Sequence, residues 1–65
     1  MSSMSAPETV EAIIQTYDSL GRGVSVLEDG SIVIIPNAKL GQKVKAKVKF
    51  SLIVEGRRVL ICEPV

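Results

Sequence analysis

The sequence GQKVKAKVKF at residues 41–50 alternates four lysines with four apolar residues. Successive side chains of a β-strand point to opposite faces of a sheet, so this alternation predicts a strand with one apolar and one cationic face. As a helix, the same residues would scatter the lysines around the axis and leave no apolar stripe. The apolar face, which we expect to pack in the core, consists of Val44, Ala46, Val48 and Phe50.

The cationic face of this strand has two interpretations. Its members, called the lysine row below, are Lys43, Lys45, Lys47 and Lys49. Lysines on a solvated strand commonly guard a sheet against edge-to-edge pairing. Alternate positions of one strand also lie about 6.5 to 7 Å apart, near the spacing of successive phosphates on a nucleic-acid strand. The lysine row therefore predicts either an ordinary solvated face or a phosphate-binding surface.

The composition is that of one small globular domain. A chain of 65 residues buries only about 60% of the surface that its unfolded form exposes, so a large pocket is not expected. Residues 1–8 are expected to form a flexible tail and residues 9–65 the domain. The single Cys62, the lack of an export signal and the short apolar runs predict a cytoplasmic protein without a disulfide or a membrane span.

No catalytic centre can be assembled from these residue types. The chain has no histidine, and its carboxylates fall mostly in expected turns and termini, so neither an acid–base pair nor an activated nucleophile can be named. Without histidine, the one cysteine cannot complete a zinc site of the usual kinds. Cys62 is expected to fill space as a small apolar residue rather than to react. We expect a protein that is not an enzyme and that takes no cofactor, metal ion or small-molecule substrate.

Charge is distributed unevenly along the chain. Residues 1–38 contain one basic and five acidic residues, whereas residues 39–65 contain seven basic and two acidic residues. The first part therefore has a net charge of −4 and the second a net charge of +5. This asymmetry predicts a one-sided electrostatic surface.

The first expected element is a strand over residues 9–17. Its β-branched content favours a strand, although Ala-Pro-Glu-Thr at residues 6–9 can also open a short helix. As a strand, it turns inward the side chains of Val10, Ala12, Ile14 and Thr16. The glycine-containing stretch at residues 18–23 then predicts a loop.

Asp29-Gly30 predicts a tight hairpin between residues 24–28 and 31–35, because this dipeptide suits the positive φ angles of a two-residue turn. Such a turn pairs Glu28 with Ser31, Leu27 with Ile32, and Val26 with Val33. The predicted core face then consists of Val24, Val26, Val33 and Ile35. The opposite face is also apolar and contains Leu27, Ile32 and Ile34, so this hairpin is expected in the middle of a sheet or under a partner.

A second tight turn is expected at Glu55-Gly56, joining the lysine strand to a last strand over residues 57–63. The predicted pairs are Val54–Arg57, Leu52–Val59, Phe50–Ile61 and Val48–Glu63. This register places Leu60 and Cys62 on the lysine face unless a bulge intervenes. Five short strands joined by such turns predict an all-β fold, a small closed or nearly closed barrel.

LGRG at residues 20–23, followed by DGSIVIIPNAKLGQKVKAKV at residues 29–48, resembles the pattern of a TRAM domain. The resemblance falls on Leu20-Gly21, Gly23, Gly30, Ile35 to Ala38, and Gly41 to Val44. It implies a five-stranded OB-like barrel that binds structured RNA, above all tRNA and rRNA. With no other domain attached, the chain is most similar to the free-standing TRAM proteins of archaea, which implies an RNA chaperone that affects RNA folding and translation.

The expected RNA contacts are cations and one aromatic ring. The candidate residues are Tyr17, Arg22, Lys39, Lys43, Lys45, Lys47, Lys49, Arg57 and Arg58. Since the only aromatic residues are Tyr17 and Phe50, binding is expected to depend on charge and shape more than on stacking, and Phe50 is expected in the core. The alternative is a protein-interaction module whose outer face, with Leu27, Ile32 and Ile34, forms a homodimer or docks an RNA-processing protein.

Overall fold

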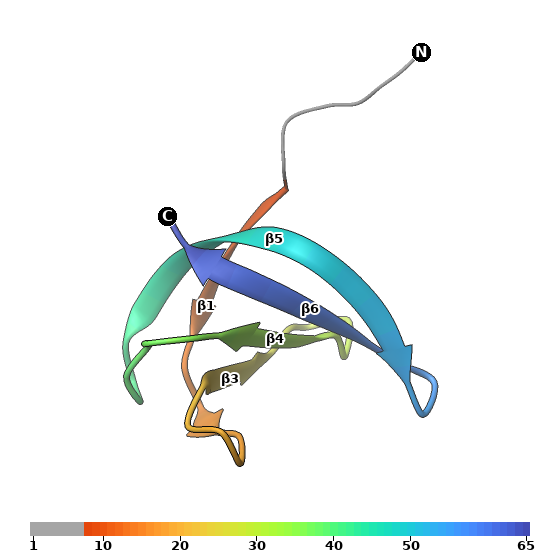
Figure 1. The fold of residues 1–65 in the computed structure, drawn as a ribbon, viewed down its shortest axis with the longest axis horizontal. Helices are drawn as coiled ribbons and strands as arrows, with labels where there is room; N and C mark the ends of the chain where they lie inside the picture. Colours follow the sequence, from red (N-terminus) through yellow and green to blue (C-terminus); the bar gives the residue numbers. More distant parts are fainter. Residues whose placement is uncertain (1–7) are drawn as a thin grey trace.

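The computed structural model describes residues 8–65 as a single curled sheet (Figure 1). Its strands are β1 (Thr9–Ile13), β2 (Thr16–Tyr17), β3 (Gly23–Val26), β4 (Ile32–Ile35), β5 (Lys43–Val54) and β6 (Arg57–Pro64). They follow the order β1-β5-β6-β4-β3-β2 and bend into a half-barrel. Residues 8–65 contain no helix, and hence none long and apolar enough to cross a membrane. The predicted all-β class is confirmed, while residues 1–7 of the predicted tail lie outside the described part of the chain.

The predicted first strand is divided in two by a change of partner at Ile14. β1 pairs with β5, and β2 pairs with β3. Between them, the Ile14 N–H donates to the Gln42 carbonyl at 3.0 Å, and the next residue, Gln15, donates to the Val24 carbonyl at 2.8 Å. The chain thus turns from one end of the sheet to the other at a residue whose side chain is almost wholly buried. This corner brings the two ends of the sheet together.

The register of the β3–β4 hairpin differs by one residue from the predicted register. The structure pairs Val26 with Ile32 and Ser25 with Val33. Since a shift of one residue turns a strand over, Ser25 is buried and faces the core. The residues that were predicted for the core but point outward are Val24 and Val26.

The side chain of Asp29 accounts for this register. Its Oδ1 accepts a hydrogen bond from the Ser31 N–H at 2.9 Å, so Asp29 bends the chain without adopting a positive φ itself. The Gly30 N–H donates to the Leu27 carbonyl at 3.0 Å, and the Leu27 N–H donates to the Ser31 carbonyl at 2.8 Å. The loop therefore has three residues, ending in Gly30 with φ 90°. The predicted Leu27–Ile32 and Glu28–Ser31 pairs are consequently wrong.

β5 contains a β-bulge at Lys49 that reverses which side chains face the core. Before the bulge, Val48 lies opposite Cys62; after it, Phe50 lies opposite Ile61. Val48 packs against the core cluster and Cys62 is buried, whereas Phe50 is 56% exposed. The predicted core position of Phe50 is therefore wrong, because the extra residue turns the rest of the strand over.

The end of this hairpin agrees with the sequence. Three predicted pairs are confirmed, namely Phe50–Ile61, Leu52–Val59 and Val54–Arg57. Glu55 and Gly56 have φ angles of 52° and 79°, as a two-residue turn of type I′ requires. The predicted Val48–Glu63 pair is wrong, since the bulge moves Val48 to Cys62. For the same reason Leu60 and Cys62 face the core and not the lysine face.

The core inside the curled sheet is small and depends on close backbone approach. It consists of Ile14, Val33, Ile35, Ala38, Ala46, Leu60 and Cys62. Gly23 lies at its edge, where an added Cβ would stand 3.0 Å from both Ala38 Cβ and Ile14 Cγ2. A side chain larger than hydrogen therefore does not fit at this position without displacing its neighbours.

The β5–β6 hairpin extends beyond its neighbours in the sheet (Figure 1). β1 pairs with β5 only over Lys43–Lys47, and β4 pairs with β6 only over Val59–Ile61. Residues 49–58 are all exposed. The fold thus consists of a half-barrel with a projecting two-stranded ribbon.

Candidate nucleic-acid interface

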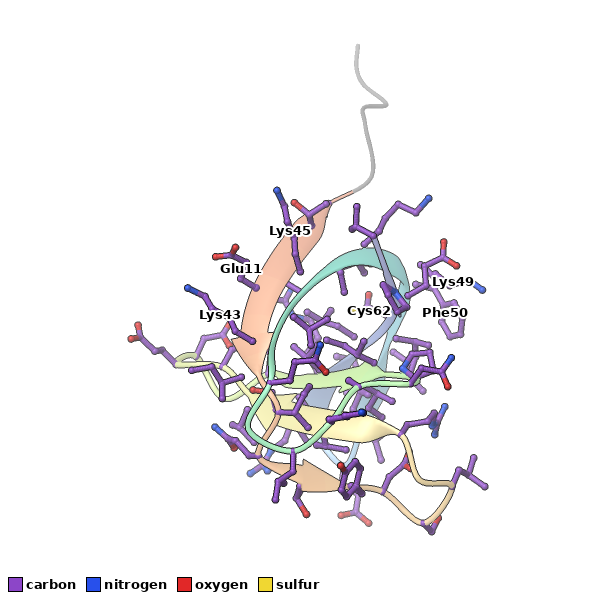
Figure 2. The ribbon with its side chains drawn as sticks, turned by 90° about the vertical axis from the view of Figure 1, so that its left-hand side faces the viewer. Glu11, Lys43, Lys45, Lys49, Phe50 and Cys62 are labelled. Atoms are coloured by element: carbon purple, nitrogen blue, oxygen red, sulfur yellow. The ribbon has the colours of Figure 1, made fainter. Side chains whose placement is uncertain are left out.

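The lysine row follows a strongly curved strand. Lys43, Lys45 and Lys47 alternate along the outer face of β5, opposite Ile13, Glu11 and Thr9 of β1, while Lys49 is the extra residue of the bulge. Figure 2 shows Lys43 and Lys45 beside Glu11 on one side of the molecule and Lys49 with Phe50 on the other. The row is therefore bent around the barrel, and it presents its charges in two directions.

Two lysines of the row share one carboxylate. Lys47 Nζ lies 3.4 Å from Glu63 Oε2, and Lys49 Nζ lies 3.9 Å from Glu63 Oε1. All three side chains are more than 40% exposed, so these ion pairs are weak and water competes with them. Within residues 8–65, Lys43 and Lys45 have no ion pair. The row therefore keeps a net positive charge.

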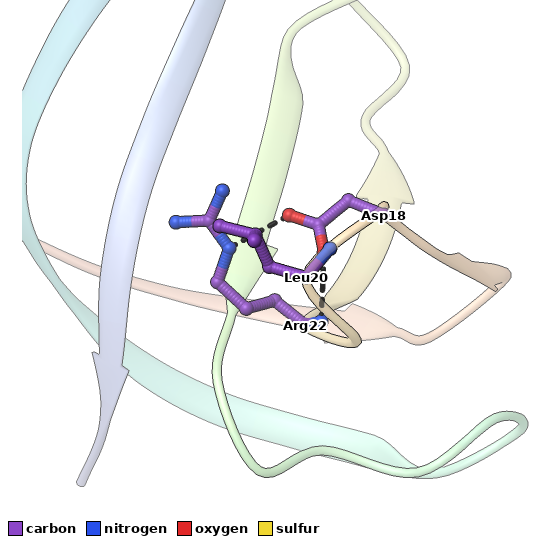
Figure 3. Close-up of polar contacts among 3 residues, drawn as sticks. All are labelled: Asp18, Leu20 and Arg22. Atoms are coloured by element: carbon purple, nitrogen blue, oxygen red, sulfur yellow. Dashed lines mark hydrogen bonds and ion pairs between the residues drawn. The ribbon is translucent and has the colours of Figure 1, made fainter.

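Arg22 is held in place by the loop that precedes β3 (Figure 3). Its Nε donates to Asp18 Oδ2 at 2.7 Å, and its backbone N–H donates to Asp18 Oδ1 at 2.8 Å. The Leu20 N–H donates to the same Oδ1 at 3.0 Å. Desolvation pushes the pKa of the Asp18 carboxyl upward, but the hydrogen bonds from Arg22 and Leu20 outweigh it and hold that pKa below its ordinary value. The carboxylate thus fixes one side of the guanidinium, whose two terminal nitrogens point away from it.

An apolar groove of about 570 Å³ lies on the outer face of the sheet beside Arg22. We call it the outer groove; its apolar lining consists of Ile32, Ile34, Leu52, Val54, Val59 and Ile61. Charged residues complete the lining, namely Arg22, Glu55 and Arg57. The groove exists because β4 is apolar on both faces and because the bulge turns Leu52 and Val54 outward.

The two neighbouring arginines of β6 do not act together. Arg57 lines the outer groove, whereas Arg58 points to the other face and contacts the β3–β4 turn. Arg58 Nη2 lies 3.5 Å from Asp29 Oδ2, and its Nε lies 3.4 Å from Ser31 Oγ. Hydrogen bonds from Ser31 first, and the charge of Arg58 as well, hold the pKa of Asp29 below its ordinary value. Arg58, which follows the β5–β6 turn, is therefore tied to the β3–β4 turn, so its guanidinium is already engaged within the protein.

Tyr17 and Lys39 belong to a third part of the surface. The Tyr17 hydroxyl accepts a hydrogen bond from the Leu40 N–H at 2.8 Å, which anchors the loop between β4 and β5. In the same loop, the backbone N–H of Lys39 donates to Gln42 Oε1 at 3.0 Å, and Lys39 is exposed. The nine candidates are therefore spread over the lysine row, the outer groove, the β4–β5 loop and the Arg58 bridge.

Reasoning from sequence missed two parts of this surface. Asp18 was not a candidate, although the spacing of four residues between Asp18 and Arg22 across a glycine-containing loop is a usable signal for a local ion pair. The contribution of Leu52 and Val54 to the outer groove depends on the bulge at Lys49, which no local motif announces.

Residues 8–65 show no cluster of metal-binding side chains, and the one thiol is buried. This part of the chain contains no group of three or more potential metal ligands. Cys62 is almost wholly buried, and burial, together with the charge of Glu8, raises the pKa of its thiol. A thiol that is buried and protonated is a poor nucleophile, so Cys62 serves as core packing.

No family model matches this chain, and a search of curated proteins finds no match. The similarity to TRAM domains therefore depends on the motifs at residues 20–23 and 29–48 alone.

Proposed function

We propose that this protein binds RNA, with the lysine row and the two arginines of the outer groove as its phosphate contacts. The observation that carries the proposal is the placement of Lys43, Lys45 and Lys47 on the outer face of β5, with Arg22 and Arg57 in the outer groove as a second group of cations. A row of exposed cations suits a polyanion better than it suits a neutral partner. Arginine adds forked hydrogen bonds to phosphate, and Arg22 is already oriented for this by Asp18.

The strand order supports a TRAM-like OB fold. When β1 and β2 are counted as one strand interrupted at Ile14, the order becomes 1-4-5-3-2-1, and β4 and β6 run parallel as strands 3 and 5. This is the strand order of the five-stranded OB barrel, a fold that binds oligonucleotides on its surface. We propose on this basis a TRAM-type protein of the cytoplasm that acts on tRNA, rRNA or other structured RNA as a chaperone, without catalysis of its own.

The proposed binding depends mainly on charge. Exposed lysines contact phosphates and carry little base information, so affinity is expected to vary little with sequence. If four to six cations contact phosphates, release of counterions predicts a slope of log affinity against log salt of about −3 to −4. Aromatic stacking contributes little in this proposal, since the only aromatic residues are Tyr17 and Phe50.

The test is fluorescence anisotropy with a labelled RNA hairpin and a labelled single strand, each at several salt concentrations. Replacing both Lys43 and Lys45 by glutamine is expected to flatten the salt slope by about 1.4 for the single strand and by about 1.8 for the hairpin. The matched control replaces both by arginine, which keeps the charge and is expected to keep the slope. Binding that does not depend on salt, or a glutamine variant with the parent slope, would contradict the proposal.

A second candidate function is favoured by the outer groove. Monomeric proteins rarely expose a large contiguous apolar patch unless it binds something. Here Leu52 and Val54 of the groove are 41% and 47% exposed, and the neighbouring Phe50 is 56% exposed. A protein-interaction module is therefore the alternative to RNA binding, and the measurement that separates them is whether RNA or protein association is lost when these residues are changed.

A further inference from the structure

Among the residues that the structure describes, the projecting part of β5 has a free edge. β1 covers β5 only as far as the Val48 N–H, which donates to the Glu8 carbonyl at 2.8 Å. Beyond it, no strand of residues 8–65 pairs with this side of β5.

The type I′ turn determines which backbone groups point out of this edge. In a β-turn the first carbonyl accepts from the fourth N–H, so Val54 and Arg57 form a hydrogen-bonded pair. Hydrogen-bonded and non-hydrogen-bonded pairs alternate along an antiparallel ladder. The N–H and C=O groups of Ser51 and Ile53 therefore point away from β6, toward the free edge.

The side chains of this segment give it no protection against pairing. Residues 50–54, which we call the β5 edge segment, read FSLIV and contain no charge, proline or glycine. Natural edge strands usually carry one of these features within the exposed edge to prevent association. Here Lys49 and its bulge precede the segment, and residues 50–54 themselves carry none. Charges occur only at its two ends, with Lys49 before it and Glu55 after it.

We propose that the β5 edge segment is the dimerisation site of this protein, pairing antiparallel with the same segment of a second copy about a two-fold axis at Leu52. The pairing places Ser51 opposite Ile53 of the second copy, where both residues have backbone groups that point outward. It also places Phe50 opposite Val54, and Leu52 opposite the Leu52 of the second copy.

The charges at the ends of the segment favour this register. With Leu52 at the axis, all five residues of the two segments overlap, and Lys49 of each copy meets the end of the other segment, where Glu55 begins the turn, so complementary charges flank the apolar centre. With Ile53 at the axis, only residues 52–54 of each copy would overlap before the Glu55-Gly56 turn, and Lys49 would lie beyond the paired residues. The apolar side chains of both copies then extend the outer grooves into one continuous surface. This charge complementarity selects a second copy of the chain over a partner of unrelated sequence.

The proposal does not depend on RNA, so it is tested on the protein of residues 1–65 without nucleic acid. Sedimentation equilibrium over about 5 μM to 1 mM is expected to show a monomer–dimer equilibrium, as suits a small interface. Hydrogen exchange is expected to protect the Ser51 and Ile53 amides only at high protein concentration. A parent protein that is monomeric over the whole range would overturn the proposal.

The decisive experiment uses the position that meets itself across the axis. Leu52→Lys and Leu52→Glu are each expected to weaken the dimer by about a hundredfold, because like charges replace an apolar contact. An equimolar mixture of the two variants is expected to associate again, since the introduced ammonium group of one copy then lies opposite the introduced carboxylate of the other. The matched control is the same pair of substitutions at Ile13, which is 56% exposed on β1 and is expected to leave association unchanged.

Circular dichroism of each variant verifies that it is folded, so that lost association is not mistaken for unfolding. A mixture that stays monomeric, or Ile13 variants that weaken association as much as the Leu52 variants, would overturn the proposed register and surface. A dimer that forms only when residues 1–7 are removed would also overturn the proposal for the chain of residues 1–65.

Discussion

Val48 lies opposite Cys62 of β6, one residue away from the partner that an unbroken ladder would give it. This shift allows both residues to face the core. Only two positions further along β5, the paired residues Phe50 and Ile61 face the outside of the sheet. Lys49 absorbs the difference as a bulge. A strand of twelve residues thus contributes to the core with one half and to the outer groove with the other.

Deleting Lys49 is expected to lower the free energy of unfolding by about 3 kcal/mol or more, because either half of β5 must then present the wrong face. Urea denaturation measures this loss. Lys49→Gln is the matched control, since it keeps the bulge and is expected to change stability by less than about 0.5 kcal/mol. Equal stabilities of the deletion and the control would contradict the assigned bulge.

Gly23→Ala is expected to destabilise the fold by about 1 to 3 kcal/mol, because its Cβ would stand 3.0 Å from Ala38 Cβ and Ile14 Cγ2. Adding Ala38→Gly removes one of the colliding methyl groups and is expected to recover part of the loss. Urea denaturation of the two single variants and the double variant gives the coupling between the sites. Strictly additive losses would show that the two residues are not in contact.

Acid is expected to destabilise the protein partly through Asp18. Its pKa in the folded state is lowered from 3.8, so the folded state gains stability from this carboxylate above that value and loses it as pH falls through the lower folded pKa. The free energy of unfolding is measured by urea denaturation at neutral pH and at about pH 3. Acidification is expected to lower it less in Asp18→Asn than in the parent. The control is Glu28→Gln, since Glu28 has no ion pair or side-chain hydrogen bond within residues 8–65. An unchanged acid loss in Asp18→Asn would contradict this role.

Arg22→Gln is expected to change the preference of the protein among RNAs, whereas removal of row lysines weakens all RNAs alike. The reason is that Asp18 holds the Arg22 guanidinium in one orientation, which suits a contact of defined geometry. Anisotropy with hairpin, bulged and single-stranded RNAs compares the variants. Asp18→Asn is expected to reproduce the effect in part, because it keeps Arg22 but loosens it. A uniform weakening by Arg22→Gln would assign this arginine to the general phosphate contacts.

Local patterns in the sequence predicted the elements that local physics determines. The alternation at residues 43–48 and the Glu55-Gly56 turn both occur as expected, since side-chain periodicity and φ preference act within a few residues. The β3 register was mispredicted because Asp29 can either adopt a positive φ or bend the chain through its side chain, and the sequence does not distinguish these two turns. The bulge at Lys49 depends on β6, which lies outside any local window.

In the candidate site, too, the features set by local sequence were predicted, and those set by contacts between distant residues were not. The lysine row was predicted from its alternation, and the structure places Lys43, Lys45 and Lys47 on the outer face of β5 but Lys49 in the bulge. The role of Arg58 depends on Asp29, a residue 29 positions away that only the fold brings near. The curvature of β5, which separates Lys43 from Lys49, likewise belongs to the curled sheet as a whole and is not encoded in the alternation of the strand.

Tyr17, whose hydroxyl accepts a hydrogen bond from the Leu40 N–H, can also serve as an intrinsic fluorescent probe. Tyr17 is the only tyrosine and the chain has no tryptophan, so intrinsic ultraviolet emission above that of phenylalanine comes from one ring. That ring is 46% exposed and tied to the β4–β5 loop. Any ligand that moves this loop or covers the ring therefore changes a signal that needs no label and has a single source.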